Sequence, residues 1–326
     1  MSYGSTISVV IPTFNRKELL RKNLESLSDQ TLPPDKFEVI IISDGGTDDS
    51  EQMVKLFNAR YGLTFHKQPH GEDVPYNVGG RLAKNDFIIF LDDDVIPHKR
   101  MLEAVINAHN RFDGPTAVIG RLQWPEEKKL TPFERYVGES GVLMGTHKIE
   151  NKDDVHFQFA LGGNFSVPRE LFEKSGGFDI DLNIYGYIDI EFGYRLKKMY
   201  DARLIYEHEA AADHWCCSPF PRFCTQRELA GVTGVIFYTK HPELSEYLKI
   251  DFVRSKKLSI LAFRTLINLC CKFIEPFIPV LERLSPFKSF LHMSYRLCIF
   301  NHYQKGLLNY LNRIKNVNVP PYPPHN

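Results

Sequence analysis

The strongest constraint on this chain is an apolar run that ends in three consecutive carboxylates. Residues Phe87 to Leu91 are all apolar and are followed directly by Asp92, Asp93 and Asp94. A short continuous apolar run is typical of a strand buried on both faces. Three adjacent acids repel one another and lose solvation there, so the arrangement favours a site for a hard divalent cation. The simpler alternative is a solvated loop in which Asp94 caps the next helix.

Strand-like and helix-like segments alternate ahead of this run. Predicted strands at residues 7–11, 37–42 and 63–67 each lead into a polar loop, and helical spacing of leucines separates the first two. Such alternation predicts an α/β fold with a parallel, doubly wound sheet. In open sheets of this kind ligands bind outside the carboxyl ends of the strands, which is where the three aspartates are expected to lie.

Four motifs in this order resemble those of family 2 glycosyltransferases. They are Val-Val-Ile-Pro-Thr-Phe-Asn-Arg at 9–16, Ser-Asp-Gly-Gly-Thr-Asp at 43–48, Asn-Val-Gly at 77–79 and Leu-Asp-Asp-Asp at 91–94. Segments 160–168, 176–179 and 185–196 continue the resemblance, which spans about residues 7–245. It implies the GT-A fold, a Rossmann-like and mostly parallel central sheet flanked by helices. It also implies inverting sugar transfer from a nucleoside diphosphate sugar, with a UDP-sugar as the expected donor.

The resemblance also implies which residues form the nucleotide-sugar pocket. They are Pro12, Thr13, Asn15, Arg16, Asp44, Asn77, Arg81, Asp92 and Asp93. Asp44 is expected to bind the base edge, because a carboxylate accepts from a ring N–H. Its alternative is a turn-forming role before two glycines. Thr13 and Arg16 are expected to line the same pocket as Asp44, and Arg81 is expected to reach the phosphates. Both arginines could alternatively be solvated surface charges, and Asp93 could point away from the site.

A divalent cation, Mn²⁺ or Mg²⁺, is the cofactor that the resemblance implies. Asp94 and His214 would bind it, and Asp92 would hold the ribose directly or through the metal. As a Lewis acid, the metal would stabilise the departing diphosphate. His208 is the competing imidazole, and a hydrogen-bonded core histidine is the alternative for either. Zinc is a further alternative, since His214 lies near Cys216, Cys217 and Cys224.

Asp189 is the expected general base. It lies at a predicted helix start near the acceptor half and would take the acceptor's hydroxyl proton, which gives single displacement with inversion. The alternative is a helix N-cap, and Glu191 is the second candidate base. Ile188 stands where the family has an acid, so an acceptor contact is missing. The sugar pocket is expected to contain Gly162, Gly163, Asn164 and Glu191.

Charge divides the chain into unlike parts. The 326 residues carry 40 basic and 40 acidic side chains, and this zero balance gives no indication of a nucleic-acid partner. The chain from Arg254 onward contains eleven Lys/Arg residues and two acids. The net charge of this tail is therefore about +9, and that of the residues before it is about −9. We expect a catalytic domain at 1–250, with a nucleotide half to about 120 and an acceptor half beyond. A basic helical extension at 251–316 and a Pro-rich mobile tail at 317–326 would follow.

The extension is predicted to contain amphipathic helices. In its first helix Arg264, Asn268, Lys272 and Glu275 oppose Leu258, Leu261, Leu266, Leu269 and Phe273, and a second helical stretch covers about 287–315. Basic amphipathic helices lie on anionic membrane surfaces, or pack on the catalytic domain or on a second subunit of a homo-oligomer. The first residues show no secretory signal, and no apolar stretch is long enough to span a membrane. We therefore expect a cytoplasmic protein with reduced thiols, for which peripheral attachment to the inner face of the cell membrane is the open alternative.

Three functions are candidates for a chain with these residues. The leading interpretation is a metal-dependent inverting glycosyltransferase that acts on a sugar, lipid-linked or other hydroxyl acceptor in polysaccharide or glycoconjugate synthesis. A sugar nucleotidyltransferase would carry a Gly-rich basic loop after the first strand, and residues 12–15 are Pro-Thr-Phe-Asn. An inactive carbohydrate-binding or scaffold protein would not need Asp44, Asp92, Asp94, Asp189 and His214 together.

Overall fold

The computed structural model describes residues 5–284 and 288–316, which divide into two compact units. The first unit holds residues up to 129, 137–183 and 188–216, and the second holds 130–136, 184–187 and the described chain from 217 onward. The sequence placed the end of the catalytic domain near residue 250, whereas helix α8 (Phe220–Lys240) groups with the C-terminal helices. The predicted mobile tail at 317–326 lies outside the described residues.

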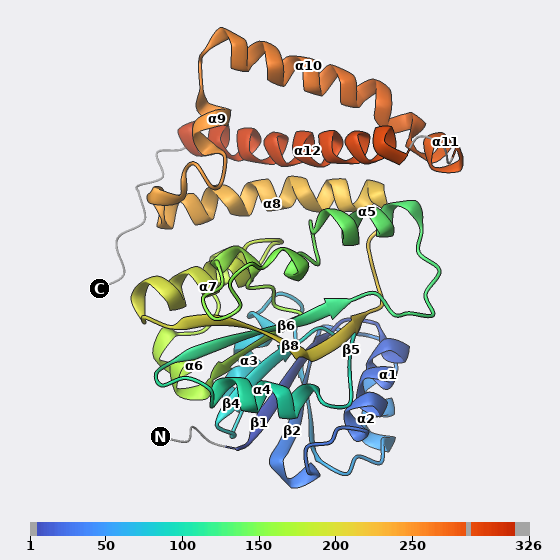
Figure 1. The fold of residues 1–326 in the computed structure, drawn as a ribbon, viewed down its shortest axis with the longest axis vertical. Helices are drawn as coiled ribbons and strands as arrows, with labels where there is room; N and C mark the ends of the chain where they lie inside the picture. Colours follow the sequence, from blue (N-terminus) through green and yellow to red (C-terminus); the bar gives the residue numbers. More distant parts are fainter. Residues whose placement is uncertain (1–4, 285–287, 317–326) are drawn as a thin grey trace. The chain divides into compact units, whose positions relative to one another are not determined.

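A mixed, mostly parallel sheet forms the centre of the first unit (Figure 1). Its strands are β1 (Ile7–Thr13), β2 (Phe37–Asp44), β3 (Gly62–Gln68), β4 (Phe87–Leu91), β5 (Val95–Pro97), β6 (Thr116–Gln123), β7 (Asn164–Pro168) and β8 (Arg203–His214). Their order is β3-β2-β1-β4-β7-β6-β8-β5, and β5 and β7 run antiparallel to their neighbours. The predicted GT-A-like fold with a C-terminal helical extension is confirmed.

Helices cover this sheet and account for the continuous apolar runs in its strands. They are α1 (Lys17–Ser28), α2 (Ser50–Leu56), α3 (Pro75–Leu82), α4 (Met101–His109), α6 (Arg169–Ser175) and α7 (Ile188–Met199), while α5 (Pro132–Ser140) contributes to both units. All five residues of β4 are buried, as a strand covered on both faces requires. The central strands are therefore rigid supports for the loops at their ends.

The pairing of β4 brings two distant loops together. Leu91, the last residue of β4, lies opposite Asn164, the first residue of the antiparallel β7. The Asp92–Asp94 loop therefore leaves the sheet where Gly162 and Gly163 enter it. The Asn164 amide donates to the Ala210 carbonyl at 2.9 Å and so fixes this junction to β8.

Helices build the second unit. They are α8, α9 (Ile250–Arg254), α10 (Leu258–Ile274), α11 (Ile278–Arg283) and α12 (Lys288–Asn316), and Figure 1 shows α12 running between α8 and α10. Gly231 of α8 and Gly306 of α12 lie at their crossing, where a Cβ on Gly306 would meet the Glu228 carbonyl at 1.9 Å. Among the described helices, none combines the length and apolar character that crossing a membrane requires.

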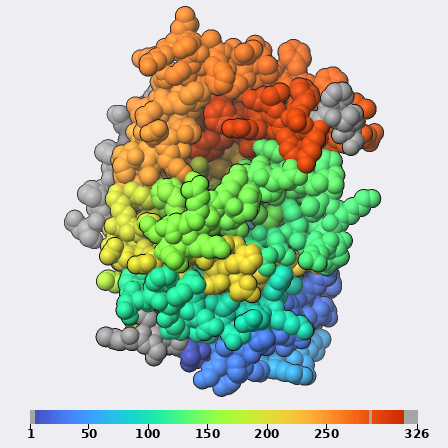
Figure 2. All heavy atoms as spheres, viewed as in Figure 1, coloured from blue at the N-terminus to red at the C-terminus, as the bar shows by residue number. Residues whose placement is uncertain are grey.

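Helix α10 buries Ile267 and Cys271, covers the polar Arg264 and Asn268 in part, and leaves most of its large apolar side chains exposed. Arg264 donates to the Val253 carbonyl at 2.6 Å, and Asn268 accepts from Asn301 of α12 at 3.4 Å. The large apolar side chains on the other face are 42–82% exposed: Leu258, Leu261, Phe263, Leu266, Leu269 and Phe273. The predicted amphipathic helix is present, but burial inside its own unit does not explain its apolar face. In the space-filling view α10 forms a continuous part of the surface (orange, Figure 2).

Candidate active site

The second and third aspartates share one guanidinium. Arg16 Nη1 lies 2.9 Å from Asp93 Oδ1 and 2.8 Å from Asp94 Oδ2, and Thr13 Oγ1 donates to Asp93 Oδ2 at 2.8 Å. Both aspartate side chains are almost fully buried, whereas that of Arg16 is 44% exposed. Asp93 does not point away from the site. It binds Thr13, the last residue of β1, and Arg16, three residues later, and thereby fixes the loop after that strand.

The first aspartate is connected to the candidate base through Tyr76 and Gly162. The Tyr76 hydroxyl donates to Asp92 Oδ1 and also lies 3.3 Å from the Gly162 carbonyl. The Gly162 N–H donates to Asp189 Oδ2 at 2.8 Å. A Cβ at Gly163 would stand 3.0 Å from Asp92 Oδ2, so glycine at this position allows the close approach. The pair of glycines therefore places Asp92 and Asp189 on either side of the same backbone segment.

Asp189 uses its two oxygens for different contacts. It is the second residue of α7, and Oδ1 accepts from the Ile190 N–H at 2.8 Å, while Oδ2 accepts from Gly162. Burial raises the pKa of Asp189 to about 6, although these N–H donors act to lower it. The carboxylate is thus mostly ionised at pH 7 but is a stronger base than an exposed aspartate.

Burial and mutual repulsion raise the pKa values of the neighbouring acids. Burial, followed by the charge of Asp94, raises the pKa of Asp92. Burial raises the pKa of Asp93 to about 6, against the opposing charge of Arg16. Burial likewise keeps the pKa of Tyr76 well above its usual value, so Tyr76 stays a hydrogen-bond donor to Asp92. The three aspartates together carry more negative charge than Arg16 balances, and this excess favours binding of a cation.

His214 lies beside this acid cluster because of strand pairing. In the β5–β8 pair Val95 is opposite His214, and the Trp215 N–H donates to the Asp94 carbonyl at 2.8 Å. His214 Nε2 stands 3.8 Å from Asp94 Oδ1, the oxygen that Arg16 does not occupy. Its Nδ1 is a buried polar atom without a partner. Two carboxylates and an imidazole form a donor set that suits Mn²⁺ or Mg²⁺. The competitor His208 is exposed, and its Nδ1 lies 3.4 Å from the Tyr206 hydroxyl.

Asp44 belongs to a separate cluster of polar and aromatic side chains. Asp44 Oδ1 accepts from Gln68 Nε2 at 2.9 Å and from the Gly71 N–H at 3.0 Å, and Oδ2 lies 2.8 Å from His70 Nδ1. The Phe14 ring is 48% exposed, and its centroid lies 5.1 Å from that of His70. A flat ring and a carboxylate side by side are what recognition of a nucleobase requires.

The other residues predicted for the nucleotide pocket have mainly structural contacts. Asn15 Oδ1 accepts from the backbone N–H groups of Thr47 and Asp48, so it joins the loops after β1 and β2. The Asn77 amide is buried, donating to the Phe178 carbonyl and accepting from its N–H at 2.8 Å each. Arg81 is ion-paired with Asp73 at the surface. Pro12 is part of β1 and lies opposite Ile42.

Glu191, the second candidate base, makes a buried ion pair. It is 1% exposed, and its two oxygens accept from Arg195 Nε and Nη2 at 2.9 and 3.0 Å. Arg195 also donates to the carbonyls of Ser175 and Gly177 at 2.6 Å. The carboxylate is therefore held by Arg195, which is itself bound to the C-terminal end of α6 and the residues after it. Asp189, in contrast, is directed at the Gly162 segment.

Several site residues have no signal in the sequence patterns. Tyr76 precedes the Asn77 motif but has no periodicity that indicates its contact with Asp92. His70 and Gln68 become visible only when β3 pairs beside β2. Asn23 occupies a core position of α1, yet its amide donates to the carbonyls of Asp92 and Val95. A polar residue on the apolar face of α1 was the one available hint.

Comparison with known proteins identifies the family. The model for glycosyl transferase family 2 matches residues 8–176, a little over half of the chain. The chain therefore belongs to glycosyl transferase family 2. This membership favours the glycosyltransferase interpretation over a nucleotidyltransferase.

Individual relatives are similar over part of their length. Validoxylamine A glucosyltransferase from Streptomyces hygroscopicus subsp. limoneus is 32% identical over 222 residues, which is 60% of this chain and 48% of the relative. Hyaluronan synthase from Pasteurella multocida is 26% identical over 58% of this chain and 22% of its own length. The chain thus spans about half, or less, of these curated relatives.

Solved structures show the same fold at low identity. Mannosyltransferase PcManGT from Pyrobaculum calidifontis, in complex with GDP-Man and Mn²⁺, has a TM-score of 0.62 at 15% identity and covers 94% of this chain and 86% of its own. Staphylococcus aureus TarS 1-349 in complex with UDP has a TM-score of 0.53 at 18% identity and covers 94% and 92%.

Removal of the Glu191 charge tests the structural role of its ion pair. In Glu191→Gln, Arg195 stays buried without a counter-charge, so the free energy of unfolding should fall by about 3 kcal/mol. Urea unfolding at pH 7 measures it. Glu170→Gln, an exposed change in the first turn of α6, is the control and should unfold like the wild type. An unchanged midpoint together with lost sugar transfer would assign Glu191 to the chemistry instead.

Proposed function

We propose that this protein transfers a sugar from a nucleoside diphosphate sugar to an acceptor hydroxyl with inversion at the anomeric carbon. The observation that carries the proposal is the position of Asp189, which Gly162 and Tyr76 link to Asp92 in the acid cluster. A general base next to a cation-binding carboxylate pair suits a reaction in which a hydroxyl attacks and a diphosphate leaves. Family membership supports the same reaction class.

A UDP-sugar is the donor that we propose. Asp44 would accept from the ring N–H of uracil, and Phe14 and His70 would contact the face of the base. TarS is similar in fold and has been solved in complex with UDP-GlcNAc. Relatives in sequence include a glucosyltransferase and the β-N-acetylglucosaminyltransferase TarP. These names favour a hexosyl or N-acetylhexosaminyl group as the transferred sugar.

Asp92, Asp94 and His214 would hold Mn²⁺ or Mg²⁺. When bound, the cation supplies Lewis-acid stabilisation of the charge that develops on the departing diphosphate. Arg16 contributes a fixed positive charge at the same edge through its contact with both Asp93 and Asp94. Tyr76 fixes the orientation of Asp92 by donating to Oδ1, and the other oxygen, Oδ2, faces Gly163. The protein thus presents a pre-oriented carboxylate before the substrate binds.

Asp189 would accept the proton of the acceptor hydroxyl as its oxygen attacks the anomeric carbon. The bond from this carbon to the diphosphate oxygen breaks while the new carbon–oxygen bond forms, and the diphosphate leaves with its electron pair. Attack on the face opposite the leaving group inverts the configuration. The Gly162 N–H stabilises the ionised form of Asp189, so the base is in its reactive state at neutral pH.

A cleft of about 440 Å³ is our candidate for the acceptor site. The Trp124 side chain is part of its lining. The centroid of its indole ring lies 5.9 Å from that of the His214 ring, in an edge-on arrangement. Aromatic rings of this kind are suited to pack against sugar faces. Arg121, His147, Lys152 and His208 also line the cleft, and no carboxylate is among the described residues that line it. This lining favours an acceptor that carries negative charge.

The outward face of α10 is our candidate for contact with an anionic membrane surface. Its apolar side chains continue along the chain into Phe277, Val280 and Leu284, each at least half exposed. A large exposed apolar face marks an interaction site. Exposed basic residues accompany it in the sequence, namely Lys256, Lys257, Lys272, Arg283, Lys288 and Arg296. Apolar burial combined with attraction to acidic headgroups is how amphipathic helices bind membranes.

Donor hydrolysis tests the reaction class without knowledge of the acceptor. The protein should release UDP slowly from UDP-glucose or UDP-N-acetylglucosamine in the presence of Mn²⁺, and EDTA should abolish the release. Asp94→Ala should lose both turnover and nucleotide-sugar affinity, whereas Asp153→Ala, an exposed change, should match the wild type. Full hydrolysis in EDTA would contradict the metal assignment, and no hydrolysis or binding of any UDP-sugar would contradict the donor class.

The base assignment predicts a mutational effect and a pH dependence. Asp189→Asn keeps the shape and the acceptor oxygen for Gly162 but cannot take a proton, so turnover should fall at least about 10²-fold. Because the pKa of Asp189 is raised to about 6, wild-type turnover should decline as the pH falls through 6, where the base becomes protonated. Steady-state rates from pH 5 to 8 measure both. Nucleotide binding should be unchanged in the variant, and an unaltered rate would exclude Asp189 as the base.

Membrane contact is tested by co-sedimentation of the full chain with vesicles. A Phe263→Ser, Leu266→Ser, Phe273→Ser triple variant should bind phosphatidylglycerol-containing vesicles at least about tenfold more weakly, since each apolar side chain contributes up to about 1.5–3 kcal/mol when buried. Binding by the wild type should also weaken with added salt.

The matched control for this experiment is a Leu56→Ser, Met199→Ser double variant, because both side chains are 60–75% exposed and lie outside α10. It should bind vesicles like the wild type. If the triple variant binds vesicles normally but changes the sedimentation coefficient of the free protein, the face of α10 contacts a second subunit instead.

A further inference from the structure

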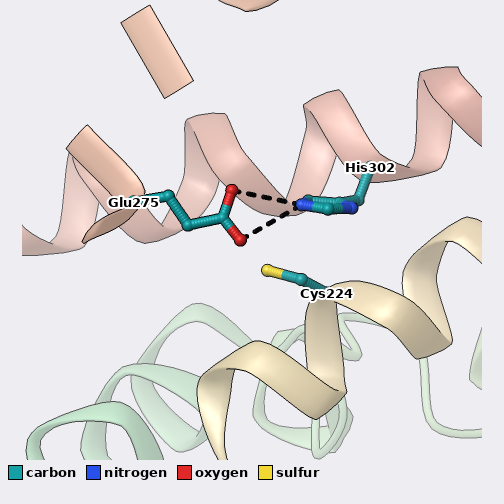
Figure 3. A group of neighbouring side chains, drawn as sticks. All are labelled: Cys224, Glu275 and His302. Atoms are coloured by element: carbon teal, nitrogen blue, oxygen red, sulfur yellow. Dashed lines mark hydrogen bonds and ion pairs between the residues drawn. The ribbon is translucent and has the colours of Figure 1, made fainter. Parts of the chain in front are cut away.

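Three potential metal ligands from different helical segments meet in the second unit. Cys224 belongs to α8, Glu275 directly follows α10, and His302 belongs to α12. Their ligand atoms all lie within 4.8 Å of one another. Figure 3 shows Glu275 and His302 pointing toward each other and Cys224 reaching the space beside them. None of the three belongs to the donor-sugar site described above.

The distances fit shared ligation better than a strong hydrogen bond. His302 Nε2 lies 3.3 Å from both carboxylate oxygens of Glu275. Charge-assisted hydrogen bonds of this type are usually about 2.7–2.9 Å long. In contrast, two ligands that are each about 2.0 Å from a tetrahedral ion stand roughly 3.3 Å apart. Small side-chain rotations would bring the Cys224 sulfur to the same centre.

A second carboxylate lies on the other side of the imidazole. His302 Nδ1 is 3.3 Å from Glu228 Oε2, and Glu228 is one turn after Cys224 on α8. Metal-binding histidines commonly donate their second ring N–H to a carboxylate, which fixes the tautomer and leaves the other nitrogen free to bind the ion. Glu228 therefore orients His302 with Nε2 directed at Glu275.

Cys224 is buried in this cluster and is 1% exposed. Burial, together with the charge of Glu275, raises the pKa of its thiol to about 12. A bound cation would reverse this effect and stabilise the thiolate.

We propose that Cys224, Glu275 and His302 bind a Zn²⁺ ion that connects α8, the end of α10 and α12. A thiolate, an imidazole and a carboxylate are the donors that zinc combines in tetrahedral sites. The hard ions expected at Asp92 and Asp94 prefer oxygen, so the thiolate would discriminate between the two sites. The sequence pattern offers zinc as an alternative for Cys224 together with His214. In the structure, the partners of Cys224 come from much later in the chain.

Cobalt substitution of the purified full chain tests this site. After chelation, one equivalent of Co²⁺ should produce a near-ultraviolet thiolate-to-metal charge-transfer band and the visible bands of a tetrahedral ion. Cys224→Ser should remove the thiolate band, and His302→Gln should weaken Co²⁺ binding at least about tenfold. Cys216→Ser and Cys270→Ser are matched controls that should keep the band, Cys216 being the cysteine closest in sequence to His214.

Two measurements on the wild type make the test independent of whether the variants fold. X-ray absorption of the zinc-loaded protein should show at least one sulfur ligand at about 2.3 Å together with lighter ligands near 2.0 Å. Zn²⁺ at about 100 times its dissociation constant should raise the thermal midpoint by ~5 °C or more, and Mg²⁺ should not. A shell of oxygen and nitrogen only, or a thiolate band lost in Cys216→Ser but kept in Cys224→Ser, would overturn the proposal.

Discussion

The placement of three adjacent carboxylates at the end of β4, two of them buried and one half-buried, is the constraint on which the catalytic edge depends. Each acid side chain needs a partner to offset lost hydration. Thr13 at the end of β1 and Arg16 in the loop after it bind Asp93, Arg16 also binds Asp94, and Tyr76 of α3 binds Asp92. Asn23 of α1 donates to the backbone carbonyl of Asp92. Satisfying the acids therefore fixes the relative positions of these segments. The same requirement leaves an excess of negative charge that suits a cation.

The order of elements and the principal acids could be predicted from the sequence, because strand runs and motif order are local properties. Asp92, Asp94, Asp189 and His214 do gather at one edge of the sheet, as the resemblance implied. The contacts of individual side chains with residues distant in the sequence could not be predicted. Nothing local distinguishes Asn77, whose amide is consumed by Phe178, from a ligand-binding amide, or Glu191 from a free base. Those distinctions depend on which distant backbone groups and side chains face each residue.

Different interactions stabilise the interior of each unit. Aliphatic strands buried under helices stabilise the first, so its polar groups are concentrated in the loops. The second also buries apolar side chains such as Phe237, Tyr295 and Leu307. It adds close helix contact at Gly231 and Gly306 and polar contacts between helices, such as that of Asn268 with Asn301. Periodicity correctly predicted an amphipathic α10 but not which face would be buried. Amphipathicity defines two faces, and only the neighbours determine which one they cover.

The outward apolar face of α10 also affects how the protein can be handled. Side chains that are already exposed contribute little to the free energy of unfolding, so polar replacements there leave the core packing intact. Exposed apolar surface promotes self-association at high concentration. Serine or lysine at these positions would therefore give a more soluble protein with an unchanged catalytic edge. Experiments on sugar transfer and experiments on surface attachment could then be carried out on separate variants.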